Sequence, residues 1–207
     1  MAARRSPGPD QRRRDAERSR ARILEAALIE FSEHGFAAAR TNSIAARAGV
    51  NPQLISYYFD GKAGLYAALA KGWQLDSAVL KRPDLPLDEV VVNFVSTDAT
   101  SRAWARLFVW QGLTGAGGLP EGGGYFADMV DDVRQRQRHG ELDPELDPAT
   151  VLVVLFAAAL APVALPHLVR GVSGQTPDSP EFLQRYTASL RLIVERLRPQ
   201  AQAGTSP

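Results

Sequence analysis

The segment from 41 to 59, TNSIAARAGVNPQLISYYF, constrains the fold of this 207-residue chain more than any other stretch. It places Ala45, Gly49 and Ile55 at intervals of four and then six residues. Two helices that cross at a sharp turn need a small residue at the crossing, a glycine in the turn and an apolar anchor on the second helix. The spacing therefore predicts a helix-turn-helix, although it also arises by chance in ordinary helical hairpins.

The ends of the two helices carry residues with known preferences for those positions. The first helix is expected over 40–48, because Gly49 is suited to end it. The second is expected to start at Asn51, whose side chain can cap a helix. Pro52 follows in the first turn, where its missing N–H costs nothing, and the helix is expected to reach about Phe59.

The second helix of this motif presents a short polar face. If Ile55 and Tyr58 pack inward, helical geometry turns the other polar side chains outward. These side chains are Asn51, Gln53, Ser56 and Tyr57. A glutamine amide can bond N6 and N7 of adenine, and serine and tyrosine hydroxyls can reach bases or phosphates. Lys62 opens the next helix, where its ammonium and the helix N–H groups could hold a backbone phosphate. The segment therefore predicts a surface that reads duplex DNA.

Helical spacing of apolar residues continues through the rest of the chain, and no alternation typical of strands interrupts it. The expected helices run from about residue 10 or 15 to Gly35, and over about 62–79, 87–95, 104–113, 125–140, 149–165 and 180–197. The glycines between 115 and 124 are expected to form a loop. The sequence therefore predicts an all-α fold with an N-terminal three-helix DNA-binding domain and a larger helical domain.

Charge is distributed unevenly along the chain, although its formal net charge is only +1. Residues 1–22 hold eight arginines and three acids, whereas residues 73–207 hold twelve basic and sixteen acidic residues. The amino end therefore favours a polyanion, and phosphate contact would offset the cost of arginines near the positive end of a helix. A solvated, disordered tail is the alternative interpretation. The expected divisions are a basic, disordered arm over 1–18, the helix-turn-helix domain over 19–65, the larger domain over 66–198 and a disordered tail over 199–207.

Two helices near the carboxyl end have broad apolar surfaces. The stretch 149–165 is apolar almost throughout and is expected to be buried on nearly all sides. A membrane span is the alternative, but the stretch is shorter than the roughly 20 residues that a bilayer needs, and Pro162 interrupts it. The last helix carries an apolar stripe that needs a partner surface. Its members are Phe182, Leu183, Tyr186, Leu190, Ile193, Val194 and Leu197.

Residues 20–70 resemble the tetracycline-repressor (TetR) family of bacterial regulators. The resemblance rests on RILEAALIEFSEHGF followed by IAARAGVNPQLISYYFDGKAGLYAAL, in the order and spacing of that family. It implies that Tyr57 and Lys62 contact phosphates, that Gln53 and Ser56 lie on the recognition helix, and that Thr41 and Asn42 begin the preceding helix. It also implies an obligate homodimer, in which the last two helices of each subunit, about 149–165 and 180–197, pair in a four-helix bundle.

The chain departs from the family pattern at two places. Family members usually carry threonine or serine near Ala39 and Arg40, so Arg40 is expected to supply that phosphate contact here. Ala63 replaces the acid that commonly follows the lysine. Beyond about residue 75 the resemblance concerns architecture rather than individual residues, and it implies an inducer pocket in the middle of the larger domain.

Aromatic and flexible side chains in the central helices are the candidates for lining that pocket. They are Trp73, Phe94, Trp104, Phe108, Trp110, Tyr125, Phe126, Met129 and His167. As a group they indicate an apolar effector of moderate size, although buried aromatic residues usually serve only to pack a core. The sequence does not identify the effector.

Enzymatic chemistry is not indicated. The chain has no cysteine, and His34, His139 and His167 lie far apart with no metal-ligand spacing. The acids between 141 and 147 are interrupted by prolines, which is typical of a solvated loop, and the glycines near 115–124 follow no strand. No enzyme activity, metal or other cofactor is therefore expected. A non-specific architectural DNA binder is disfavoured because most of the chain is acidic.

The sequence predicts a cytoplasmic, homodimeric repressor without a membrane segment. It is expected to bind a pseudo-palindromic operator with half-sites about 34 Å apart, and to be released by a small, largely apolar ligand that acts through the helix over 62–79. An activator, or a regulator controlled by a protein partner, remains the alternative.

Overall fold

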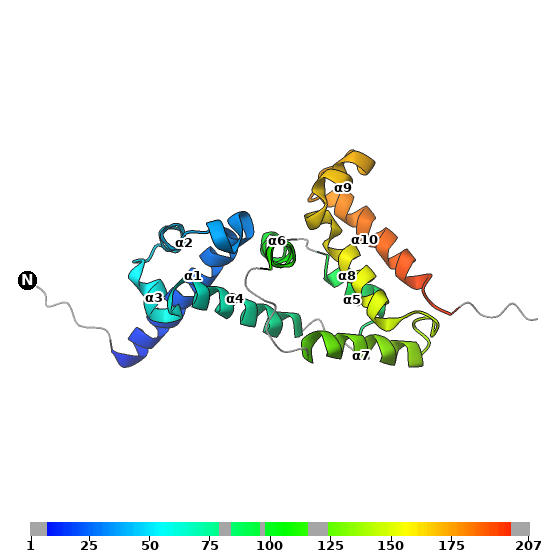
Figure 1. The fold of residues 1–207 in the computed structure, drawn as a ribbon, viewed down its shortest axis with the longest axis horizontal. Coiled ribbons are helices and arrows are strands. Elements are labelled where there is room, and N and C mark those ends of the chain that lie inside the picture. Colours follow the sequence, from blue (N-terminus) through cyan, green and yellow to red (C-terminus); the bar gives the residue numbers. More distant parts are fainter. Residues whose placement is uncertain (1–7, 79–83, 96–97, 116–123, 200–207) are drawn as a thin grey trace, which may run out of the picture. The chain divides into compact units, whose positions relative to one another are not determined.

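The computed structural model describes residues 8–78, 84–95, 98–115 and 124–199 (Figure 1). Within these ranges it contains only helices and no strand, as the all-α prediction requires. The helices are α1 (Pro9–Ala38), α2 (Thr41–Ala48), α3 (Gln53–Phe59), α4 (Gly61–Ala78), α5 (Leu87–Asn93), α6 (Ala99–Thr114), α7 (Gly124–Arg138), α8 (Pro148–Ala164), α9 (Pro166–Ser173) and α10 (Pro180–Glu195). Residues 200–207 of the tail expected over 199–207, and most of the glycine loop, lie outside the described residues.

The described helices pack into two units. The first contains α1 to α3, α4 as far as Trp73, and α6 from Arg106, and the second contains the remaining helices. The expected division at residue 65 therefore falls too early, because the buried face of α4 packs on α1. The ring of Tyr66 lies edge-on to Phe31 and Phe36, with centroids 5.0 Å apart in both pairs.

The first helix begins earlier than an arm over 1–18 would allow. Residues 9–18 are the first turns of α1, whereas residues 1–7 lie outside the described part of the chain. Pro9 and Asp10 suit a helix start, and the i,i+4 pair Arg13–Glu17 and the i,i+3 pair Asp15–Arg18 link exposed side chains along this stretch. The prediction of disorder is therefore wrong for residues 9–18, because acids alternate with the arginines at helical spacing.

Glycine interrupts α1 where the sequence predicts its end. Gly35 has φ 68° and ψ 173°, and the short turn that follows it completes the helix at Ala38. The missing side chain also makes room for Trp110, since a Cβ on Gly35 would lie 3.3 Å from the Trp110 ring. Gly35 therefore serves both the backbone turn and the packing of α6 within the first unit.

The helix-turn-helix forms as predicted. Ile44, Ala45 and Ile55 are buried between the helices, and Gly49 ends α2 in the left-handed conformation with φ 62° and ψ 43°. The inward position expected for Tyr58 is taken instead by its neighbour. Phe59 is buried, whereas Tyr58 is only half-buried.

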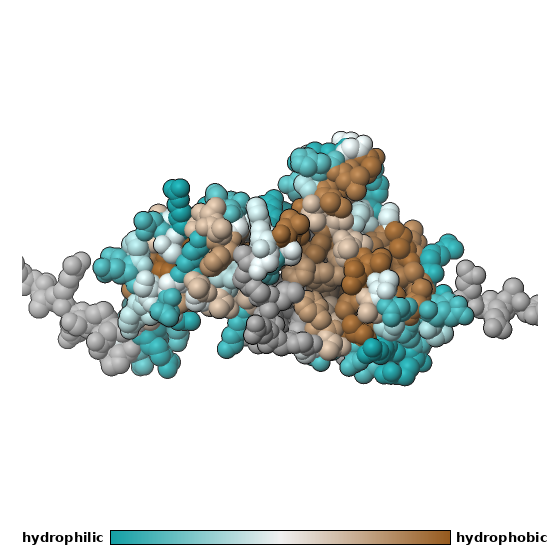
Figure 2. Space-filling model, in the orientation of Figure 1, coloured by the Kyte–Doolittle hydropathy of each residue, from teal (hydrophilic) through white to brown (hydrophobic). Residues whose placement is uncertain are grey.

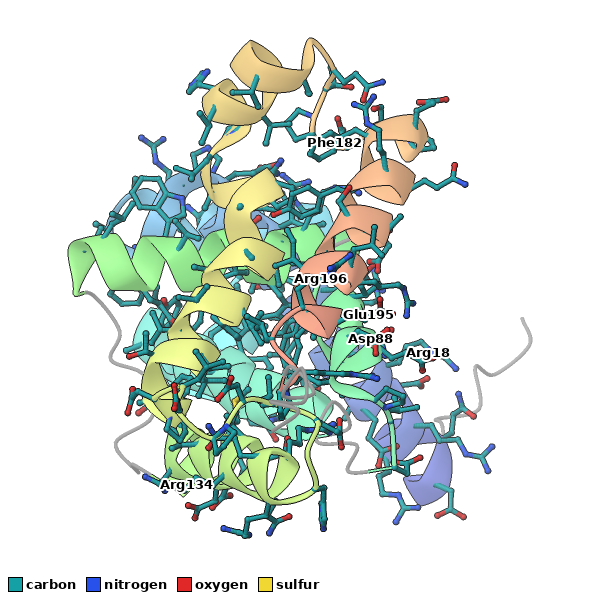
Figure 3. The ribbon with its side chains drawn as sticks, turned by 90° about the vertical axis from the view of Figure 1, so that its right-hand side faces the viewer. Arg18, Asp88, Arg134, Phe182, Glu195 and Arg196 are labelled. Carbon is teal, nitrogen blue, oxygen red and sulfur yellow. The ribbon has the colours of Figure 1, made fainter. Side chains whose placement is uncertain are left out.

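The second unit has its own apolar core, to which α5, α7, α8, α9 and α10 contribute. Arg136, which is only 3% exposed, links this core to the segment that precedes α5. The Arg136 guanidinium donates to Asp132 at 2.8 Å, to Glu141 at 2.9 Å and to the Leu85 carbonyl at 2.9 Å. Two carboxylates thus compensate the buried charge. Asp88 lies beside α10, where Arg191 bonds it at 2.9 Å (Figure 3).

The carboxyl-terminal helices differ from expectation in three respects. Val153 and Val154 are 67% and 57% exposed, so α8 is not buried on nearly all sides. Ile193, expected on the inward stripe of α10, is 56% exposed, because the buried stripe follows Phe182, Leu183, Leu190 and Val194. An additional helix, α9, starts at Pro166, where the sequence analysis expects none.

No helix in the described ranges is by itself long and apolar enough to cross a membrane. Taken together, α8 and α9 have the length and composition of a membrane span, but the two helices meet at a bend of 83°. Val151, Leu155 and Ala159 of α8 belong to the core of the second unit, as expected for a helix with one buried face.

The close packing at the junction between α3 and α4 predicts how two glycine substitutions in α4 change the stability of the protein. A Cβ on Gly64 would overlap the carbonyl oxygen of Phe59, whereas a Cβ on Gly72 would meet nothing within 4 Å. Gly64→Ala should lower the free energy of unfolding by about 2 kcal/mol, because backbone must move. Gly72→Ala should raise it by about 0.5–1 kcal/mol, because alanine favours a helix interior. Chemical denaturation of both variants tests the difference, and equal effects would contradict the tight junction.

Candidate nucleic-acid interface

The first helix holds the start of α2 through a buried acid. Glu30 is 4% exposed, and its Oε1 accepts the backbone N–H of Arg40 at 3.0 Å. Arg40 is the residue immediately before α2, so this bond satisfies a backbone donor at the helix entrance. Glu30 could not be predicted from the sequence, since an acid ten residues earlier gives no local signal of such a contact.

The start of α3 is capped as predicted. Asn51 Oδ1 accepts the backbone N–H of Gln53 at 2.9 Å, and the Asn51 carbonyl accepts from Leu54 at 2.9 Å. The Asn51 oxygen thereby fixes the first turn of α3. Its side-chain amide nitrogen still faces solvent, because Asn51 is exposed.

The outward face of α3 carries the side chains expected to read DNA. Gln53 and Ser56 are exposed, and Tyr57 is 78% exposed. Ile55 and Phe59 hold the opposite face in the core. Figure 1 places α2 and α3 beside α1 in the first unit. The arrangement gives a short polar helix face backed by a buried apolar one, which can enter a major groove.

The residues at the start of α2 flank this face. Arg40 and Asn42 are exposed, and Thr41 is half-buried at the first helical position. The first N–H groups of a helix lack partners within it, so this end can also bind an anion.

Lys62 has a partner within the protein. Its Nζ donates to the Ala37 carbonyl at 3.0 Å and lies 4.9 Å from the centre of the Phe36 ring. This contact ties the start of α4 to the last turn of α1. An ammonium has three donors, so the expected phosphate contact would share the group with Ala37.

Two exposed arginines of α1 contact the helix-turn-helix. Arg20 donates to the Tyr58 carbonyl at 2.8 Å, and Arg22 donates to the Gly49 carbonyl at 3.4 Å. From the sequence, both arginines are expected to belong to a basic helix end suited to phosphates. Their protein partners lie 38 and 27 residues away, so the local pattern could not reveal them.

The proposed ligand residues are divided between the two units. Phe108 and Trp110 belong to the first, and Trp110 packs over Gly35. Phe94, Trp104, Phe126 and Met129 are half-buried in the second, and His167 is exposed on α9. Phe94 lies edge-on to Phe156 at 5.6 Å between ring centres. The side chains of Trp73 and Tyr125 lie outside the described residues.

The acids between 141 and 147 have structural partners. Glu141 accepts from Arg136, and Asp147 caps α8 by accepting from the Thr150 N–H at 2.7 Å. The Thr150 side chain and N–H donate to Asp147 and lower the pKa of that carboxyl. Among the described residues, no group of three or more histidines, cysteines and acids could hold a metal.

Two family models match the chain and together cover most of the described helices. The model for bacterial regulatory proteins of the tetR family matches residues 23–69. The model for the tetracyclin repressor-like C-terminal domain matches residues 87–196. The first match contains the helix-turn-helix and the start of α4, and the second runs from α5 to α10.

Two proteins of similar sequence are named as transcriptional regulators. The HTH-type transcriptional repressor SCO4008 of Streptomyces coelicolor is 33% identical over 88% of this chain and 98% of its own length. The HTH-type transcriptional regulator RutR of Escherichia coli K12 is 28% identical over 86% and 90%.

A solved structure confirms the fold. The transcriptional regulator SCO4942 from Streptomyces coelicolor superposes with a TM-score of 0.72 at 28% identity, over 87% of this chain and 98% of its own. The first family model, the relatives and this structure agree with the helix-turn-helix described above, and the second family model agrees with the helices that follow it. The chain therefore belongs to the TetR family of bacterial transcriptional regulators.

Proposed function

We propose that this regulator is a homodimeric repressor that binds a pseudo-palindromic operator and is released by a small, largely apolar ligand. The exposed polar face of α3 carries the proposal, since Gln53, Ser56 and Tyr57 project from a helix whose other face is buried. The name of SCO4008 as a repressor supports the direction of control.

The roles proposed for the interface follow from side-chain chemistry. Gln53 bonds an adenine edge, and Ser56 bonds a neighbouring base or phosphate. Tyr57, Arg40 and Lys62 bind phosphates, which position α3 in the groove without reading sequence. Thr41, Asn42 and Asn51 border this surface and complete it at the helix starts.

Dimerisation is proposed through the exposed apolar faces of α8 and α10. Val153 and Val154 on α8, and Leu192 and Ile193 on α10, are more than half exposed in the single chain. Figure 2 shows hydrophobic surface, drawn brown, over the part of the second unit that contains α8 and α9. Burying such surface contributes roughly 25 cal/mol per Å², and a second copy supplies a matching face by symmetry.

Effector binding is proposed to involve the aromatic residues of the central helices, including Phe94, Trp104 and Phe126. A ligand that prefers the form with low DNA affinity needs only about 1–3 kcal/mol of coupling to relieve repression. The helix α4 follows the helix-turn-helix directly, so a shift of α4 would carry the signal to α3.

Selection from random duplex oligonucleotides tests the proposed function. The purified chain should enrich a pseudo-palindrome, and footprints on that sequence should disappear when an effector from a panel of small apolar compounds is added. Enrichment without release by any compound would favour control by a protein partner. Absence of any preferred duplex would contradict the proposal.

The division between base and phosphate contacts can be measured with two variants of α3. Gln53→Ala should reduce the preference at one base pair by about 1–3 kcal/mol, because it removes a bidentate contact. Tyr57→Phe should lower affinity for every duplex by about 0.5–1.5 kcal/mol, because it removes one hydroxyl bond. Fluorescence anisotropy against single-base operator variants separates the two effects. A uniform loss for Gln53→Ala would show that Gln53 does not read a base.

The proposed dimer surface can be tested by placing a charge on it. Leu192 is 60% exposed in the single chain, so Leu192→Glu should leave the helical content unchanged. The variant should sediment as a monomer and bind the operator more weakly, because an unpaired carboxylate would be buried in the dimer. Gln135→Glu, at an exposed position of α7, is the matched control and should remain a dimer. A dimeric Leu192→Glu variant would place the interface elsewhere.

A further inference from the structure

Two arginines only two residues apart on α1 hold the carboxyl ends of both helices of the helix-turn-helix. Arg20 bonds the Tyr58 carbonyl in the last turn of α3, and Arg22 bonds the carbonyl of Gly49, which ends α2. The last carbonyls of a helix lack partners within it and carry partial negative charge, so each guanidinium lies where it is electrostatically favoured.

Arg20 makes two different contacts with the end of α3. Its Nη1 donates to the Tyr58 carbonyl at 2.8 Å, and its Cζ lies 4.6 Å from the centre of the Phe59 ring. Phe59 is itself buried in the core of the first unit. A planar guanidinium can stack on the ring and donate to the carbonyl at the same time, whereas the compact ammonium of lysine cannot reproduce both contacts.

Arg22 reaches the turn because Gly49 has no side chain. A Cβ at this position would lie 2.5 Å from Nη2 of Arg22 and would displace the guanidinium. The glycine therefore permits the left-handed turn and the approach of α1 together. The bond from Arg22 is longer than that from Arg20, at 3.4 Å against 2.8 Å, so Arg20 is the stronger attachment.

We propose that Arg20 is a positioning residue for sequence recognition: it sets the direction of α3, and hence where Gln53 and Ser56 meet the bases. This inference rests on the proposed reading of DNA by α3. The helix has seven residues and is only about 10 Å long, so a tilt of about 10° at its held end displaces the other end by about 2 Å. A shift of that size breaks hydrogen bonds to base edges, which tolerate only a few tenths of an ångström.

The alternative role for Arg20 is direct phosphate contact, as for the other arginines of α1. The two roles differ in what they do to specificity. A lost phosphate contact weakens binding to every duplex and reduces the salt dependence. A lost positioning contact weakens binding to the preferred duplex and leaves non-specific binding unchanged.

The experiment compares three full-length variants with the parent chain on the selected operator and on a scrambled duplex, over a series of salt concentrations. The variants are Arg20→Ala, Arg20→Lys and, as control, Arg18→Ala. Arg18 lies on the same helix, and the contact that Arg18 makes is an exposed ion pair with Asp15 at 3.7 Å (Figure 3). Arg18→Ala and Arg20→Ala change the net charge equally.

Both Arg20 variants should lose about 10- to 100-fold in operator affinity, bind scrambled duplex no more weakly than Arg18→Ala does, and select a less defined sequence. Arg18→Ala should change binding to the two duplexes by equal factors. Full recovery in Arg20→Lys, or an equal loss on both duplexes with a weaker salt dependence, would overturn the proposal in favour of phosphate contact. Circular dichroism confirms folding, and Arg20→Lys retains the charge if Arg20→Ala unfolds. A parent chain with no preferred duplex would instead defeat the proposed function itself.

Discussion

The close crossing of α2 and α3 at Gly49 is the constraint on which the rest of the first unit depends. Gly49 adopts a left-handed conformation that other residues rarely adopt, and its missing Cβ admits the guanidinium of Arg22. Ala45 and Ile55 are both buried, and burial of this side of α3 leaves its polar residues facing outward. The exposed face of α3 is thus a consequence of backbone geometry at one residue.

Contacts from α1 stabilise this arrangement from both ends. Glu30 accepts the N–H that precedes α2, while Arg20 bonds a carbonyl at the end of α3. Lys62 adds a bond between the start of α4 and the Ala37 carbonyl. The helix-turn-helix is therefore attached to α1 by polar contacts at its periphery as well as by its apolar core, and such rigidity suits the proposed entry of α3 into a groove of DNA.

The features that the sequence predicted correctly are those with local causes. Asn51 caps α3, Gly49 ends α2 and Gly35 interrupts α1, because each preference depends on a residue and its immediate neighbours. The features that it missed depend on distant partners. Arg20 and Glu30 acquire their roles only when the chain has folded. The helix α9 was missed because the apolar run before Pro166 concealed a sharp bend.

The exposed apolar surface of the second unit also could not be predicted from local sequence patterns. Composition marked α8 as buried on nearly all sides, yet Val153 and Val154 are exposed in the single chain. Periodicity also placed Ile193 on the buried stripe, whereas the stripe follows Val194. Apolar character alone does not distinguish a face that packs within the chain from one that is left for a partner.

Dimethyl sulfate protection of the selected operator tests most directly whether α3 enters the major groove. If α3 enters the major groove, guanine N7 atoms, which lie in that groove, should be protected in two patches about one helical turn apart on one face of the duplex. Protection confined to adenine N3 atoms in the minor groove, or spread evenly along the duplex, would contradict this placement of α3.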